Sequence, residues 1–287
     1  MGRSQRKLMA EEEFLHRQAL SMALQQNHLS QRFDGSMSRR IGSTSSRRRN
    51  LSDSFSNGKQ APDFLENIKF KKFVLVHGEG FGAWSWYKTI ALLEETGLVP
   101  IAIDLTGCGI DLADTNNVTT LAEYSKPLIS YLQNLPEDEQ VILRPFDVFA
   151  EELGSAERFM LESQFLIHGN GEDKPPTGFM FKKQQMKGLY FNQSQTKDVA
   201  LAMVSMRPVP LGPIMEKLSL SPEKYGTGRR FFIQTLDDRA LSPDVQEKLV
   251  RDSPPERVFK IKGSDHCPFF SKPQALHKIL LEIAQIP

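Results

Sequence analysis

The chain has 287 residues, 39% of them hydrophobic, which suffices for one large α/β domain and a tail but not for a second full domain. The 36 Lys and Arg residues nearly balance the 35 Asp and Glu residues, so the net charge is only +1. A chain with this charge has no overall electrostatic attraction for nucleic acid, which excludes nucleic acid as the main partner on this ground. Two cysteines, Cys108 and Cys267, are too few for a disulfide framework or a zinc site. No apolar run reaches the roughly 18 residues of a membrane span, and no secretory signal core follows the N-terminus.

These exclusions leave a narrow class of proteins. We expect a protein that is neither secreted nor membrane-bound and that resides in a reducing compartment. Its partner should be a small, weakly charged molecule, and we expect no metal and no other cofactor. The sequence leaves the oligomeric state open.

Residues 1–62 differ from the rest of the chain. Basic clusters at 39–40 and 47–49 lie among Ser, Asn and Gln, with few large apolar residues. Such a segment cannot bury enough surface to offset its ordering entropy, so we predict a disordered tail with one short helix near 11–24. A leader rich in Ser and Arg indicates a transit peptide and a chloroplast location, although the acidic run 11–13 departs from that pattern and leaves the cytoplasm as the alternative.

From Phe70 onward, apolar runs alternate with segments of helical period, which predicts a parallel sheet with crossover helices in residues 63–287. Leucines between 121 and 135, and leucines and isoleucines between 276 and 286, recur at helical spacing and predict two amphipathic helices on the sheet. The predicted strands are 73–76, 99–103, 140–143, 230–234 and 258–261.

Residues 147–225 have a different pattern. Helical pieces are interrupted by the proline-containing runs 174–176 and 207–213. We interpret this stretch as a helical cap inserted over the ends of the strands, and not as more sheet.

Polar residues follow three of the predicted strands. The turn His77-Gly78-Glu79-Gly80 follows the first strand, the acidic pair Asp237-Asp238 the fourth, and His266 the fifth. A serine esterase needs two backbone N–H donors for the oxyanion, a nucleophilic serine, an acid and a histidine base, and α/β-hydrolases carry them in this chain order. Three of the four components are therefore present in the expected order.

The nucleophile is the missing component. The sequence contains no Gly-x-Ser-x-Gly, and the strand 140–143, after which the serine should come, passes directly into Arg144 and Pro145. The chain has the sequence of a serine hydrolase from which the serine segment is absent.

Four strings of residues carry a specific resemblance. The chain resembles the plant methylesterase family of α/β-hydrolases, near the salicylate-binding esterases and hydroxynitrile lyases, from about Phe70 to Pro287. Members of that family hydrolyse methyl esters of small hormone acids such as salicylate, jasmonate and indole-acetate. The resemblance implies an α/β-hydrolase fold, a small ester or acid as the ligand, His266 as general base, Asp238 as its acid and the backbone N–H of Glu79 as oxyanion donor. The matching strings are 73–78, 84–87, 104–107 and 262–266.

The departure from the family pattern is equally clear. After the strand equivalent to 140–143, the family continues with Val-Gly-His-Ser-x-Gly-Gly, a helix and a further strand, a unit of about 35 to 40 residues. Its loss removes the nucleophile, one oxyanion donor and a central strand. We therefore expect a methylesterase that is inactive or severely impaired, or alternatively a non-catalytic small-molecule binding protein on the same fold.

Two further alternatives concern single residues. Asp237 competes with Asp238 as the acid, but Asp237 could as easily be a turn residue or a helix cap. We prefer Asp238 because it precedes Pro243 at the spacing of the family that the chain resembles. The pattern Gly78-x-Gly80-x-x-Ala83, with Asp104 after the next strand, satisfies a loose dinucleotide-binding fingerprint. It does not account for the acid and histidine near the C-terminus, so we prefer the esterase interpretation.

Overall fold

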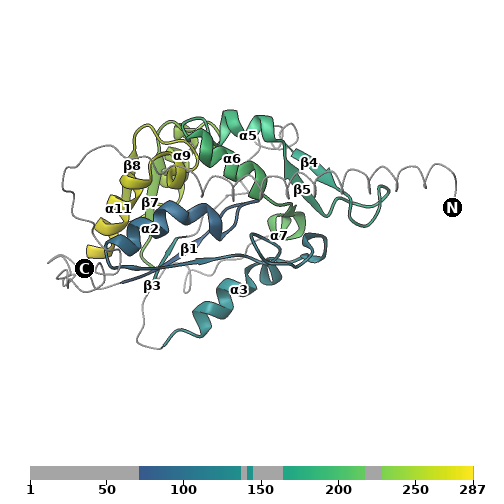
Figure 1. Ribbon diagram of the computed structural model, residues 1–287, viewed down its shortest axis with the longest axis horizontal. Coiled ribbons are helices and arrows are strands. Elements are labelled where there is room, and N and C mark those ends of the chain that lie inside the picture. Colours follow the sequence, from purple (N-terminus) through teal and green to yellow (C-terminus); the bar gives the residue numbers. More distant parts are fainter. Residues whose placement is uncertain (1–70, 137–140, 145–163, 217–227, 287) are drawn as a thin grey trace, which may run out of the picture. The chain divides into compact units, whose positions relative to one another are not determined.

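A computed structural model describes residues 71–136, 141–144, 164–216 and 228–286 (Figure 1). The chain divides into two units, Met1–Gly58 and Lys59–Pro287, and every described residue belongs to the second unit. The predicted tail with its short helix, and both ends of the predicted cap, lie outside the described residues. None of the described helices has the length and apolar character that a membrane crossing requires.

The first part of the unit is a parallel sheet. Strand β1 (Lys72–Val76) lies between β2 (Val99–Ile103) and β3 (Val141–Arg144) and pairs in parallel with both. Helices α2 (Tyr87–Glu95) and α3 (Leu121–Gln133) make the crossovers and lie on opposite sides of the sheet in Figure 1. The three predicted strands here are confirmed to within a residue at each end.

The last part of the unit adds a second parallel pair. Strand β7 (Phe231–Thr235) pairs with β8 (Arg257–Ile261), and α9 (Pro243–Asp252) connects them. Helices α10 (Pro268–Ser271) and α11 (Pro273–Gln285) end the chain. Within the described ranges, no ladder joins β3 to β7, so the parallel strands form two groups, β2-β1-β3 and β7-β8.

The segment between these groups, which we call the insertion (164–216), contains strands that the sequence did not predict. Strands β4, β5 and β6 form a small antiparallel sheet, with helices α5, α6 and α7 around it. The strands have only four, four and two residues, too short for a visible alternation of apolar and polar positions. Their bounds are Gln164–Ile167, Gly178–Phe181 and Val209–Pro210, and those of the helices are Lys183–Leu189, Thr196–Ser205 and Leu211–Met215.

Strand β1 is buried on both faces, as a central parallel strand should be. On one face, Phe73 and Leu75 join a core that also receives side chains from the insertion, α2 and α11. On the other, Val74 and Val76 pack with Leu105 and the side chains of α3. Burial of one Phe or Leu side chain contributes about 1.5 to 3 kcal/mol to the free energy of folding. The shared core therefore stabilises the packing of the insertion and the C-terminal helices against the sheet.

Candidate active site

The two residues predicted as acid and base lie in direct contact. Because β7 and β8 are parallel, their carboxyl ends lie at the same edge of the pair, and Asp238 and His266 follow those ends. Asp238 Oδ2 lies 2.9 Å from His266 Nδ1, and both residues are buried. The carboxylate only accepts, so Nδ1 carries the proton. The predicted hydrogen bond between His266 and one of the two carboxylates is present, and Asp238 makes it.

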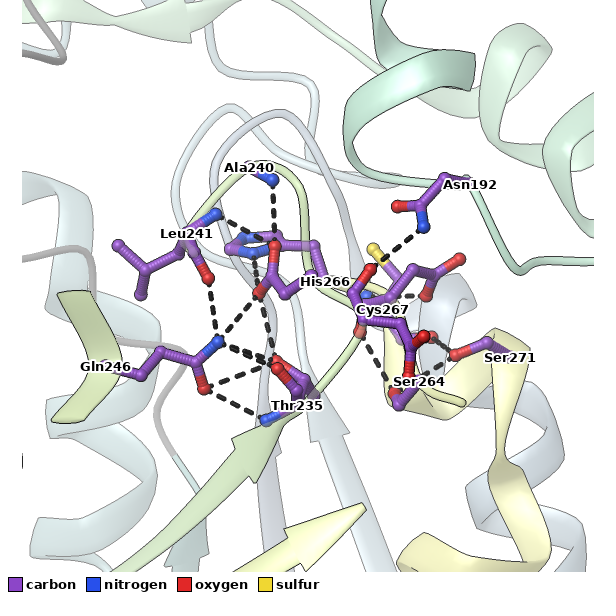
Figure 2. A network of polar contacts seen from close by, with 12 residues as sticks. Asn192, Thr235, Ala240, Leu241, Gln246, Ser264, His266, Cys267 and Ser271 are labelled. Atoms are coloured by element: carbon purple, nitrogen blue, oxygen red, sulfur yellow. Dashed lines mark hydrogen bonds and ion pairs between the residues drawn. The ribbon is translucent and has the colours of Figure 1, made fainter. Parts of the chain in front are cut away.

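Further donors hold the Asp238 carboxylate in place (Figure 2). The backbone N–H groups of Ala240 and Leu241 donate to Oδ1 at 2.9 and 2.8 Å, and the Thr235 hydroxyl donates to Oδ2 at 3.0 Å. Hydrogen bonds from backbone and hydroxyl groups stabilise the ionised form and fix its orientation. Asp238 is therefore suited to orient an imidazole and to stabilise it when it becomes protonated.

Gln246 of α9 completes this network. Its Oε1 accepts from the Thr235 N–H at 2.9 Å, and its Nε2 donates to the carbonyls of Thr235 and Leu241 at 3.0 and 2.7 Å. The side chain is 2% exposed and also reaches Asp238 Oδ2 at 3.4 Å. The sequence pattern predicted neither α9 nor a role for Gln246, so only the folded chain brings this side chain to Asp238.

Asp237 has a different role. Its Oδ2 accepts from the Gly263 N–H at 2.6 Å, and its own N–H donates to the Ser264 carbonyl at 3.0 Å. These bonds join the loop after β7 to the loop after β8. The geometry favours Asp238 over Asp237 as the partner of the base.

The turn after β1 is shaped by glycine. The Phe81 N–H donates to the Gly78 carbonyl at 3.2 Å, and Gly80 has φ of +73°, a left-handed conformation that glycine adopts without steric cost. The His77 ring donates from Nδ1 to the Gly78 carbonyl and accepts at Nε2 from the Leu105 N–H, at 2.8 and 3.1 Å. Burial lowers the pKa of His77. The lowered pKa keeps the ring neutral. Because both of its nitrogens are hydrogen-bonded to backbone groups, the ring holds the turn in place.

Glu79, at the tip of the turn, interacts with the base. Burial raises the pKa of the half-buried Glu79 carboxyl to about 7, while the charge of His266 opposes the rise. The Tyr190 ring, from the insertion, meets the His266 ring edge-to-face with 4.7 Å between centroids. Burial raises the pKa of Tyr190, and the charge of Glu79 adds to the rise. The turn after β1, the insertion and the loop after β8 that carries His266, which we call the His266 loop, thus meet at one place.

Neither thiol has the environment of a nucleophile. Burial raises the pKa of Cys267, next to the base, well above its usual range, and raises that of Cys108 to about 11. A nucleophilic cysteine requires the opposite shift. Asp104, the acid of the loose dinucleotide fingerprint, accepts from the backbone N–H groups of Ala83 and Ile110 at 2.6 and 3.1 Å, so its carboxylate supports two loops.

Comparisons with known proteins agree with the geometry. No family model matches the chain. Two Arabidopsis thaliana proteins, named "Putative methylesterase 14, chloroplastic" and "Putative methylesterase 12, chloroplastic", are 69% and 68% identical to it, over all of this chain and 93% of each relative. A solved structure of the methylesterase protein MES16 from Arabidopsis is 33% identical and superposes with a TM-score of 0.67, covering 74% of this chain and 98% of that one.

The alignments with the two relatives also differ from the chain in length. Each alignment spans 323 positions and includes all of this chain, which has 287 residues. The relatives therefore have 36 positions to which no residue of this chain corresponds. A strand-plus-helix unit has about this size.

Proposed function

Because this chain belongs to the plant methylesterase family and has the α/β-hydrolase fold, we propose that it is a carboxylic ester hydrolase by descent that has lost its nucleophile. It is a chloroplast protein, as are the relatives named above, in agreement with the location predicted from its leader. The substrate class of the ancestral site is a small, uncharged methyl ester of a carboxylic acid, which the resemblance to hormone methylesterases supports.

One observation carries the proposal: the acid and base are hydrogen-bonded to each other while the sequence contains no Gly-x-Ser-x-Gly. In an intact enzyme, the serine Oγ attacks the ester carbonyl as the histidine takes its proton, the alkoxide leaves as methanol, and water then releases the acid. Here the sequence contains no Gly-x-Ser-x-Gly motif to supply that hydroxyl. Loss of the serine in a comparable enzyme lowers turnover by about a million-fold, so we propose that ester hydrolysis is abolished in practice.

We place the absent segment between Leu143 and Arg144. Strand β3 ends one residue later, at Arg144, and Pro145, which cannot donate to a ladder, follows. The separation of the described strands into two parallel groups supports this position, and the 36 unmatched positions agree with the size of such a segment. The segment would have carried the serine, the second oxyanion donor and the strand between β3 and β7.

The second candidate function is a non-catalytic binding protein. The observation that favours it is the retained site itself, in which Glu79, Tyr190 and the Asp238–His266 pair still meet. An uncharged ester or a protonated acid could bind there, with Glu79 and His266 as hydrogen-bonding partners, without being cleaved.

The experiment compares the purified protein with His266→Ala on methyl salicylate, methyl jasmonate, methyl indole-acetate and p-nitrophenyl acetate. We expect equal rates for the two proteins, because the sequence lacks the Gly-x-Ser-x-Gly motif that carries the nucleophile. A rate that disappears in His266→Ala would overturn the proposal. Calorimetric titration with the same methyl esters separates a binding protein, which gives saturable heat, from a chain with neither activity.

A further inference from the structure

The insertion is hydrogen-bonded to each of the three loops that carry the site. The Arg207 N–H donates to the Gly80 carbonyl at 3.0 Å in the turn after β1. The Asn192 side-chain amide donates to the Asp237 carbonyl at 2.9 Å in the loop after β7. In the loop after β8, the acceptor is the carboxylate of Asp265, the residue directly before the base.

Asp265 makes the contact between the insertion and the His266 loop. Its side chain is fully buried, and three donors reach it: the Gln193 N–H at 2.9 Å and the Ser194 hydroxyl at 2.8 Å on Oδ2, and the Cys267 N–H at 3.0 Å on Oδ1. Two donors therefore come from the insertion and one from the His266 loop itself. Hydrogen bonds to a charged group are stronger than neutral ones, and a buried carboxylate that lost them would be strongly destabilised.

The segment bound by Asp265 carries the ring that touches the base. Tyr190 lies three residues before Gln193, and its ring packs edge-to-face on His266 with 4.7 Å between centroids. Three residues span at most about 10 Å, so fixing Gln193 beside residue 265 restricts where the Tyr190 ring can lie relative to residue 266. The Asp265 carboxylate thus links the position of the Tyr190 ring to the position of the His266 imidazole.

We propose that Asp265 is a positioning residue that holds the segment 190–194 against the His266 loop and thereby fixes the Tyr190 ring on the imidazole. The Tyr190 ring then forms the wall of the site on the insertion side, and a ligand at His266 meets this ring in a fixed orientation. The inference concerns the site of the proposed function but rests on its geometry alone.

The test uses the full-length protein without ligand and records the ring signals of His266 by NMR, assigned with His266→Ala. Tyr190→Leu supplies the reference for an imidazole without its aromatic neighbour. In Asp265→Asn, we expect the His266 ring signals to move toward their positions in Tyr190→Leu, and amide hydrogen exchange over 190–194 to accelerate roughly tenfold. The matched control Asp173→Asn, an exposed residue of the insertion, should leave both measurements unchanged.

A second pair of variants covers the case in which Asp265→Asn does not fold. Ser194→Ala removes one of the three donors, whereas Ser194→Thr keeps the hydroxyl, so the first should shift the His266 signals and the second should restore them. His266 signals that stay unchanged in folded Asp265→Asn or Ser194→Ala would overturn the inference, as would a Ser194→Thr protein that behaves like Ser194→Ala. Turnover of a methyl ester would refute the proposed function without touching this result, because the NMR experiment contains no substrate.

Discussion

The Asp238–His266 pair is held by residues that have no chemical role themselves. Thr235 and Gln246 bond to each other and to the Asp238 carboxylate, and both are almost fully buried. A buried polar network is favourable only while every member keeps its partners. At the scale of single residues, the stability of the site therefore depends on Gln246 as much as on the pair.

Gln246→Leu tests this dependence. The substitution leaves the buried N–H and carbonyl of Thr235, and the partly buried carbonyl of Leu241, without the partner that now satisfies them. Unfolding in urea should show a loss of about 3 kcal/mol. The exposed Gln184 of α5 offers a matched control, because Gln184→Leu should change the free energy of unfolding by less than about 0.5 kcal/mol. Equal effects of the two substitutions would contradict the network.

Glu79 predicts a pH dependence of stability. Its pKa is about 7 in the folded protein, above the ordinary value of 4.5, so between these values the folded state binds more protons than the unfolded state. Stability must then fall as pH rises from about 4.5 to 7. Glu79→Gln removes this loss and should be more stable than the wild type at pH 8, by at most about 3 kcal/mol, and by less at pH 5.

The free energies of unfolding of the wild type and Glu79→Gln have to be compared with each other at every pH measured. His77, whose pKa is lowered by burial, makes stability rise with pH through about 6.5, and it does so equally in both proteins. The difference between the two unfolding free energies therefore isolates Glu79. Glu94→Gln, at an exposed position of α2, is the matched control variant, and a pH-independent difference for Glu79→Gln would refute the raised pKa.

At the scale of elements, the insertion is joined to the sheet by an ion pair between helices. Lys88 of α2 donates to Asp198 of α6, a fully buried carboxylate that also accepts from the Tyr87 hydroxyl at 2.6 Å. Lys88 reaches the Phe270 carbonyl of α10 at 3.3 Å as well. Three helices from distant parts of the sequence thus meet at one lysine.

Lys88→Met should be strongly destabilising, because it leaves the buried Asp198 carboxylate without its cation. We expect a loss of about 3 to 5 kcal/mol in urea unfolding, and a partial recovery in the double variant Lys88→Met/Asp198→Leu, which removes the uncompensated charge. Lys126→Met, at an exposed position of α3, is the control. A double variant as unstable as the single one would show that packing, and not charge, is responsible.

At the scale of the whole molecule, the dominant feature is that the described parallel strands fall into two groups, β2-β1-β3 and β7-β8. Strand edges and apolar faces that a central strand and helix would cover bind hydrophobic dyes and promote association. We therefore expect ANS binding and a broad thermal transition. A sharp, reversible transition above about 60 °C would contradict this expectation.

Insertion of the 36 unmatched positions from the 69% identical relative between Leu143 and Arg144 tests the same idea in reverse. The chimera should melt sharply, bind less ANS and hydrolyse a methyl ester with a rate that depends on His266. Replacing the introduced serine by alanine should keep the sharp transition and abolish the rate. A well-folded chimera without activity would show that more than the nucleophile unit has been lost.

The sequence by itself determined the parallel strands, the two long amphipathic helices and the order of the site residues. These features follow from local patterns, since strand and helix periods and the residues at strand ends are visible within short windows. The absence of a Gly-x-Ser-x-Gly motif was equally visible, because a motif on a tight turn is a local string.

Only the tertiary structure decided which polar group meets which. Asp238 and Asp237 are adjacent in the sequence, yet one bonds to His266 and the other to the Gly263 N–H. The roles of Gln246 and Asp265, and the raised pKa of Glu79, likewise depend on partners from distant elements. Hydrogen bonding and burial are set by what surrounds a group after packing, and a single sequence does not contain that information.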